Sequence, residues 1–199
     1  MFRSFLLFAI ASATSLLSFS QSSYTDSINK YQFDYKKDLY AVIQKDTAFV
    51  KFYPINSSYK VIARVEKVYG QSFFPMSTTD GKSKQAIKYA ALKFDLHGKE
   101  YTLYAYQLSF LLSNPEHKND FFVPFTDETS GIESYGGGRY MDFTQANITA
   151  GNTLLIDFNK SYNPYCAFKI GYSCPIPPKE NELKVEIKAG EMNFGKSSH

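Results

Sequence analysis

Apolar positions follow two different periods along the chain, first a helical one and then an alternating one. Over residues 25–41, Ile28, Tyr35 and Leu39 recur at a spacing close to the helical repeat. This segment is the one helix that the pattern predicts. From about residue 47 onward, apolar and polar residues alternate in short runs that are typical of half-buried strands.

The clearest strand signal is a hairpin over residues 84–108, in which His97-Gly98 forms the turn. A change of the alternating face near Ala90-Ala91 predicts a bulge. Further short strands are predicted at 59–65, 73–76, 121–125, 141–143, 154–158 and 183–187. The repeated strands predict a mainly β fold: a curled antiparallel sheet or partly closed barrel with one N-terminal helix.

The first 20 residues have the pattern of a secretory signal peptide. Arg3 supplies the positive charge, Phe5 to Leu17 form an apolar region, and Ser18 and Ser20 precede a cut before Gln21. The apolar run is shorter than the roughly 20 residues of a membrane span. We therefore expect an exported chain, periplasmic or extracellular, with residues 21–199 as a single β-rich domain and no stable membrane anchor after cleavage.

Composition narrows the classes of partner and cofactor. The net charge is +3, and it falls to about +2 without residues 1–20, which is too small to indicate a nucleic-acid partner. His97, His117 and His199 lie far apart in the sequence and not beside other ligand residues. The sequence therefore indicates no metal site, no cofactor and no Ser-His-Asp triad.

Three glycines, Gly136, Gly137 and Gly138, stand directly before Arg139. Such a run lets backbone N–H groups converge on an anion, and Arg139 would then bind a carboxylate or phosphate. The alternative is a tight crossing of two chain segments, with Arg139 paired to a buried aspartate such as Asp127 or Asp142. Both interpretations stay open.

A second polar cluster follows at the end of a predicted strand. Asp157, Asn159 and Asn163 offer oxygen atoms to a ligand, or else cap their own backbone. Cys166 and Cys174 are the only cysteines, and export predicts a disulfide between them. The competing interpretation makes Cys166 a catalytic nucleophile, which would require a base that the neighbouring sequence lacks.

A proline-rich stretch, Pro175 to Pro178, then leads into Glu180 and Asn181. The prolines fix the backbone in an extended form. Glu180 at this position is a candidate general base, although a solvated or lysine-paired glutamate is the commoner situation. Asn181 is a candidate hydrogen-bonding residue for a ligand.

Three motifs together resemble one known family: Y-G-G-G-R-Y at 135–140, D-F-N-K-S-Y-N-P-Y-C-A-F at 157–168 and C-P-I-P-P-K-E-N at 174–181. They are similar to the bacterial family of uncharacterised proteins called domain of unknown function 1684. The resemblance extends upstream through the hairpin and Phe125-Thr126-Asp127. It implies no activity, because the family has none established, but it marks the motif residues as positions that recur.

Two functional hypotheses follow from these residues, beside a purely structural alternative in which the loops form a packed scaffold. In the first, a small anionic or polar ligand binds to the three glycines, Arg139, Asn159, Asn163 and Asn181. In the second, the protein is an exported hydrolase or transferase that uses Arg139 with Glu180, Asp157 or Cys166. The sequence favours the binding protein, because no acid, base and nucleophile are spaced as a known mechanism requires.

Overall fold

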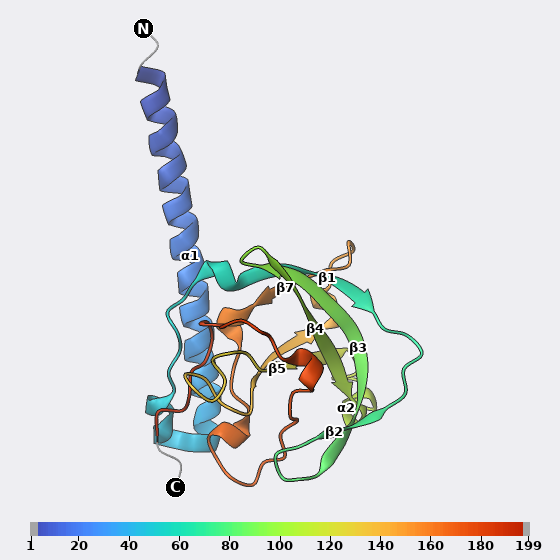
Figure 1. Cartoon of the computed structure of the whole chain (residues 1–199). Coiled ribbons are helices and arrows are strands. Elements are labelled where there is room, and N and C mark those ends of the chain that lie inside the picture. Colours follow the sequence, from blue (N-terminus) through green and yellow to red (C-terminus); the bar gives the residue numbers. More distant parts are fainter. Residues whose placement is uncertain (1–3, 197–199) are drawn as a thin grey trace.

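The structure is a computed structural model that describes residues 4–196, with side chains from residue 22 onward. Figure 1 shows a long N-terminal helix beside a strongly curved sheet. The side chains of the predicted export signal, residues 1–20, lie outside the described part, and so does His199. No helix within the described residues is both long enough and apolar enough to cross a membrane.

The N-terminal helix, α1 (Ser4–Ile43), is longer at both ends than the predicted range of 25–41. Ile28 and Leu39 are buried, whereas Phe33 and Tyr40 on the opposite face are exposed. This one-sided burial is the pattern that the helical period predicts. Short 3-10 turns follow along the chain: η1 (Gln44–Phe49), η2 (Ser57–Tyr59), η3 (Gln145–Asn147), η4 (Phe158–Lys160), η5 (Tyr165–Ala167) and η6 (Lys179–Asn181).

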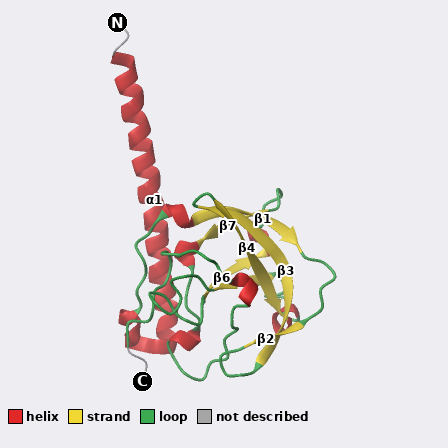
Figure 2. Cartoon of the chain, in the orientation of Figure 1, coloured by secondary structure: helices red, strands yellow, loops and turns green. Residues whose placement is uncertain are grey.

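Seven antiparallel strands form one sheet that curls into a half-barrel (Figure 2). They are β1 (Lys60–Lys67), β2 (Phe74–Ser77), β3 (Ser83–Leu96), β4 (Lys99–Leu108), β5 (Asp120–Phe125), β6 (Arg139–Thr144) and β7 (Thr153–Asp157). The order is β6-β5-β4-β3-β1-β7, with β2 paired to β3. The predicted fold class is therefore confirmed, and a single helical turn, α2 (Ser109–Leu112), is added after β4.

The predicted hairpin is present as β3 and β4, which pair from Ala86↔Leu108 to Leu96↔Lys99. The register shifts between Lys88 and Ala90, so the predicted bulge is confirmed. His97 and Gly98 both have positive φ angles, of 54° and 78°, as a two-residue turn between twisted strands requires. The hairpin supplies long strands around which the rest of the sheet curls.

The apolar core lies on the concave side of this sheet. Its buried members come from strands far apart in the sequence and include Leu92, Leu103, Val123, Met141 and Ile156. A second, smaller apolar cluster contains Met76, Ala86, Tyr106, Leu108, Phe122 and Tyr140. Adjacent residues such as Phe122 and Val123 belong to different clusters because successive side chains of a strand point to opposite faces.

The prediction of a strand over residues 183–187 is wrong. Its backbone groups bond to loops and to side chains instead of to a neighbouring strand. The Ile187 N–H donates to Asp127 Oδ2 at 2.8 Å, and the Ile187 carbonyl accepts from Arg139 at 2.9 Å. Apolar residues at alternating positions, Leu183 and Ile187 among them, are still buried, which explains why the pattern is typical of a strand.

Candidate functional site

Arg139 at the start of β6 is completely buried. Its Nη2 atom donates to Asp127 Oδ1 at 3.0 Å. Both terminal nitrogens also donate to backbone carbonyls of the C-terminal segment, those of Ile187, Ala189 and Glu191. Arg139 therefore pairs with Asp127, not with Asp142, and has no terminal nitrogen directed toward a ligand. The structure supports the interpretation of Arg139 as a residue that holds the fold.

The three glycines before Arg139 allow close packing of the chain. At Gly138, where φ is +85°, an added Cβ would lie 2.6 Å from the Phe125 carbonyl oxygen and 2.6 Å from Pro177 Cγ. At Gly137 a Cβ would lie 2.4 Å from the Tyr135 ring, and at Gly136 it would lie 3.4 Å from the Cα of a neighbouring glycine. The three glycines therefore allow two chain segments to cross closely, as in the second of the two interpretations, and do not form an anion-binding loop.

We expect Gly138→Ala to lower the free energy of unfolding by about 3 kcal/mol, because it combines an unfavourable φ with steric overlap. Gly98→Ala is the matched control, since Gly98 has a φ of +78° and open space around its Cα. That variant should lose only about 1 kcal/mol. Urea denaturation of both variants measures the difference. Equal losses would show that the predicted overlap at Gly138 is absent.

Asn181 completes the backbone pairing between two strands. Its amide accepts from the Tyr104 N–H at 2.8 Å and donates to the Tyr104 and Pro124 carbonyls at 2.8 and 2.6 Å. Pro124 has no N–H to offer to β4, so a side chain takes the place of that part of the ladder. Asn181 is completely buried and its amide is occupied by backbone groups.

Asn159 and Asn163 are also buried and bonded to the protein. Asn159 bonds to the backbone of Asn56 through both amide atoms and to Asp157 Oδ1. Asn163 donates from its amide to the Met192 carbonyl at 2.8 Å. These side chains hold loops in place, and neither lines any of the pockets considered below.

The three candidate catalytic residues lie apart. Cys166 forms a disulfide with Cys174, with the sulfur atoms 2.23 Å apart, so it has no free thiol. Glu180 accepts from Lys88 Nζ at 2.8 Å and from the Tyr106 hydroxyl at 2.5 Å. Burial alone would raise the pKa of Glu180, but these two hydrogen bonds outweigh it and lower the pKa. Glu180 is therefore a carboxylate paired with Lys88 and Tyr106. Asp157 lines a pocket that contains neither Glu180 nor Cys166.

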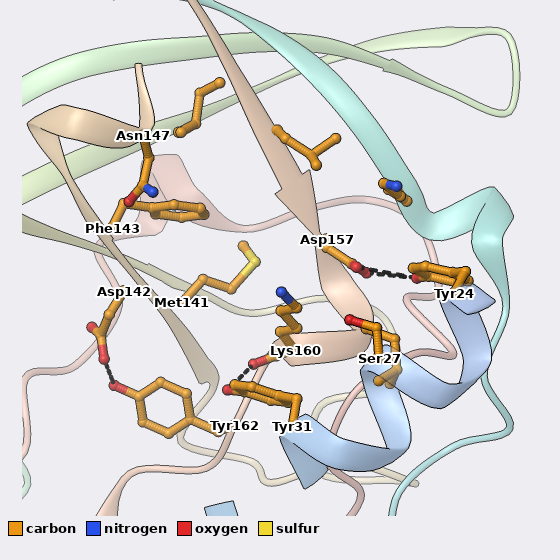
Figure 3. Close-up of a pocket in the computed structure, with 14 residues that line it drawn as sticks. Tyr24, Ser27, Tyr31, Met141, Asp142, Phe143, Asn147, Asp157, Lys160 and Tyr162 are labelled. Atoms are coloured by element: carbon orange, nitrogen blue, oxygen red, sulfur yellow. Dashed lines mark hydrogen bonds between the residues drawn. The ribbon is translucent and has the colours of Figure 1, made fainter. Parts of the chain in front are cut away.

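Asp157 lines a pocket of about 500 Å³ between α1, β6 and β7, which we call the polar groove (Figure 3). The two strands are the ends of the curled sheet, and α1 lies across the opening between them. Tyr24 of α1 donates to both Asp157 oxygens, at 3.0 and 3.1 Å, and Tyr31 donates to the Lys160 carbonyl at 2.8 Å. The helix is thus bonded to the strand end that it covers.

Asp142 and Tyr162 form the centre of a larger concave region. The Tyr162 hydroxyl donates to Asp142 Oδ2 at 2.5 Å. Both residues line the polar groove and two further pockets, each of about 480 Å³. One of these lies over β4 to β6, and the other lies between α1 and the loop that leads to Pro175.

Asp142 is exposed to solvent, but it lies in a concave part of the surface and lines the groove. Partial loss of hydration in this concave surface raises the pKa of Asp142, the Tyr162 hydrogen bond opposes the change, and the Asp120 carboxylate adds to it. Burial and the Asp142 charge raise the pKa of Tyr162 well above its ordinary value, so its hydroxyl remains a donor. A carboxylate in these surroundings gains stability from an additional hydrogen-bond donor.

Lys60 and Lys160 supply the positive charges of the polar groove. Lys60 Nζ lies 5.0 Å from the centre of the Tyr24 ring, and Lys160 Nζ lies 5.6 Å from that of Tyr31. Neither lysine has a salt-bridge partner among the residues that the structure describes. Figure 3 shows the Lys160 side chain directed into the space between β6 and β7.

The sequence pattern does not identify Asp142, Lys160 or Tyr162 as ligand-binding residues. Lys160 and Tyr162 lie inside the recurring motif at 157–168, which was the available signal. Asp142 alternates with the apolar Met141 and Phe143 on β6 and therefore has the pattern of any strand residue on a solvated face. Within the described residues, no group of three His, Cys, Asp or Glu side chains is arranged to hold a metal ion.

The fold and the groove define a small half-barrel protein with a helix across its open side. The chain belongs to the family described as protein of unknown function DUF1684, whose model matches residues 45–192. It is also similar to the solution NMR structure of an uncharacterized protein from gene locus rrnAC0354 of Haloarcula marismortui. That likeness has 26% sequence identity and a TM-score of 0.66, and it covers 87% of this chain and 96% of the other. No curated protein matches the sequence.

Proposed function

We propose that the protein binds a small ligand that carries an anionic group and a hydrogen-bond donor. The observation that carries this proposal is the pair of lysines without salt bridges, Lys60 and Lys160, in the same groove as Asp142. The lysines attract an anionic group, and Asp142 accepts from a donor on the ligand. A groove of about 500 Å³ has the size of a pocket for a small molecule.

This proposal keeps the class of ligand expected from the sequence and changes the residues that would bind it. Arg139 and the buried asparagines support the walls, whereas the lysines and Asp142 face the ligand. An enzymatic role receives less support. Arg139, Glu180 and Cys166 line none of the pockets considered, so they do not form a common site with Asp157.

We also propose that the protein is exported, with residues 1–20 as its signal peptide. A cut before Gln21 would retain Tyr24 and Tyr31, the part of α1 that lines the groove. The disulfide between Cys166 and Cys174 supports this location, because such bonds persist in oxidising compartments.

Titration of the ¹⁵N-labelled protein with butyrate, 2-aminobutyrate and butylamine tests the ligand class. We expect 2-aminobutyrate, which has both groups, to shift groove resonances at the lowest concentration. Lys160→Gln should weaken its binding about tenfold through loss of a charge-assisted hydrogen bond, and Asp142→Asn should reduce its advantage over butyrate.

Lys45→Gln is the control for the loss of one positive charge, because Lys45 is exposed and lines none of these pockets. It should leave the affinities unchanged. The proposal fails if none of the three compounds shifts groove resonances, or if Lys45→Gln and Lys160→Gln weaken binding equally.

A further inference from the structure

The pocket over β4 to β6, which we call the aromatic pocket, is lined mainly by apolar side chains. They come from three strands, the α2 turn and the proline-rich loop: Tyr106, Leu108, Leu111, Phe121, Phe122, Tyr140, Phe143 and Pro175. Tyr106, Leu108, Phe122 and Tyr140 also belong to the second apolar cluster and are buried. The wall of this pocket is therefore part of a packed apolar cluster.

The polar groups at the rim of the aromatic pocket are bonded to one another. His117 Nδ1 lies 2.8 Å from Asp120 Oδ2. The Gln107 amide donates to the carbonyls of Lys118 and Asp120, both at 3.1 Å. These mutual bonds leave a largely apolar surface of the pocket for an occupant, so its complement is a hydrocarbon or aryl group.

The aromatic pocket adjoins the polar groove. Asp142, Phe143, Asn147 and Tyr162 line both. A ligand held at Lys160 and hydrogen-bonded to Asp142 would thus have an apolar cavity of about 480 Å³ on the other side of Asp142. Both cavities have aromatic and aliphatic lining residues, but only the polar groove contains lysines, Lys60 and Lys160.

We infer that the ligand is amphiphilic: its anionic group binds in the polar groove, and an apolar chain or ring fills the aromatic pocket. This inference rests on the proposed function, because the anionic group sets the position of the ligand. Asp142 and Tyr162 then lie beside the junction between the two parts of the molecule, where a donor group of the ligand would meet the carboxylate.

Calorimetric titration with straight-chain carboxylates from acetate to octanoate tests the inference. Burial of each methylene contributes about 0.8 kcal/mol, so affinity should rise about threefold to fourfold for each added carbon until the pocket is full. Leu111→Ser should weaken octanoate binding about tenfold and leave acetate binding unchanged, because Leu111 lines the aromatic pocket only.

Phe110→Ser is the matched control. Phe110 is the neighbour of Leu111 on α2, is 56% exposed and lines none of the pockets considered. Affinities that do not depend on chain length, or equal effects of the two substitutions, would overturn the inference. If acetate binding still depends on Lys160 in that case, the proposed function stands without it. If no carboxylate binds, the inference is wrong, and the proposed function is wrong as well if 2-aminobutyrate does not bind.

Discussion

Replacement of Arg139 by methionine is expected to lower the free energy of unfolding by about 3 to 5 kcal/mol. The substitution leaves Asp127 as a buried charge without its ion-pair partner, and the carbonyls of Ile187, Ala189 and Glu191 lose a donor. Urea denaturation followed by circular dichroism measures the loss. If Arg139→Met does not fold, Arg139→Lys can be measured instead. It retains the positive charge but not the planar guanidinium, so its free energy of unfolding should be lower than that of the parent protein and higher than that of Arg139→Met.

The other arginine of the described chain provides the control. Arg64 on β1 is 64% exposed and lies 3.1 Å from Glu66 in a surface salt bridge. Arg64→Met should change the free energy of unfolding by less than about 0.5 kcal/mol. Comparable losses for the two arginines would contradict the structural role assigned to Arg139.

Glu191 is expected to make the stability of the protein depend strongly on pH. It is completely buried, and its Oε2 atom accepts from the Tyr35 hydroxyl at 2.9 Å and from the Asn163 N–H at 2.7 Å. Burial raises the pKa of Glu191 to about 8, against the opposing effects of these bonds and of Arg139. The folded protein thus keeps a proton that the unfolded chain has lost at neutral pH.

The sign of the effect follows from proton linkage. Below a pH of about 4.5, the carboxyl group is protonated in both states and the stability is complete. Between pH 4.5 and about 8, Glu191 should cost the folded state about 1.4 kcal/mol for each pH unit, because only the unfolded chain loses the proton. The dependence should end above pH 8.

The Glu191→Gln variant tests this linkage. Its amide oxygen can accept from Tyr35 and Asn163, and it carries no proton to lose. Urea denaturation at pH 5 and at pH 8 should show a much smaller decrease in stability than in the parent protein. Glu186→Gln is the control, since Glu186 is 54% exposed and pairs with Lys188. An unchanged pH dependence in Glu191→Gln would assign the effect to other groups.

The alternation of apolar and polar residues predicted the strands whose position depends on neighbouring residues in the sequence. Alternation located β1, the β3–β4 hairpin and its bulge, because a strand with one buried face repeats every two residues. The same rule failed at residues 183–187, where burial alternates but the hydrogen-bond partners are loop backbone groups and the side chains of Asp127 and Arg139. Asp127 and Arg139 lie 60 and 48 residues before Ile187, so no local sequence pattern can predict that they are its partners.

The candidate functional site could also be predicted only in part from the sequence. The glycines before Arg139 do signal special geometry, but the sequence cannot say whether an anion or another chain segment approaches them. In the structure, the Phe125 carbonyl and Pro177 lie close to Gly138. Asp142 becomes noticeable only when the sheet curls and brings Tyr162 to within hydrogen-bond distance of it. A groove formed by the two ends of a sheet depends on the tertiary fold.

The bonding of Arg139 also bears on the order of events during synthesis. The guanidinium receives its backbone acceptors from residues 187 to 191, which are synthesised 48 to 52 residues after Arg139. Until they are synthesised, a buried Arg139–Asp127 pair would lack four of its hydrogen bonds, three from Arg139 and one to Asp127, so the barrel cannot reach its final state before these residues are present.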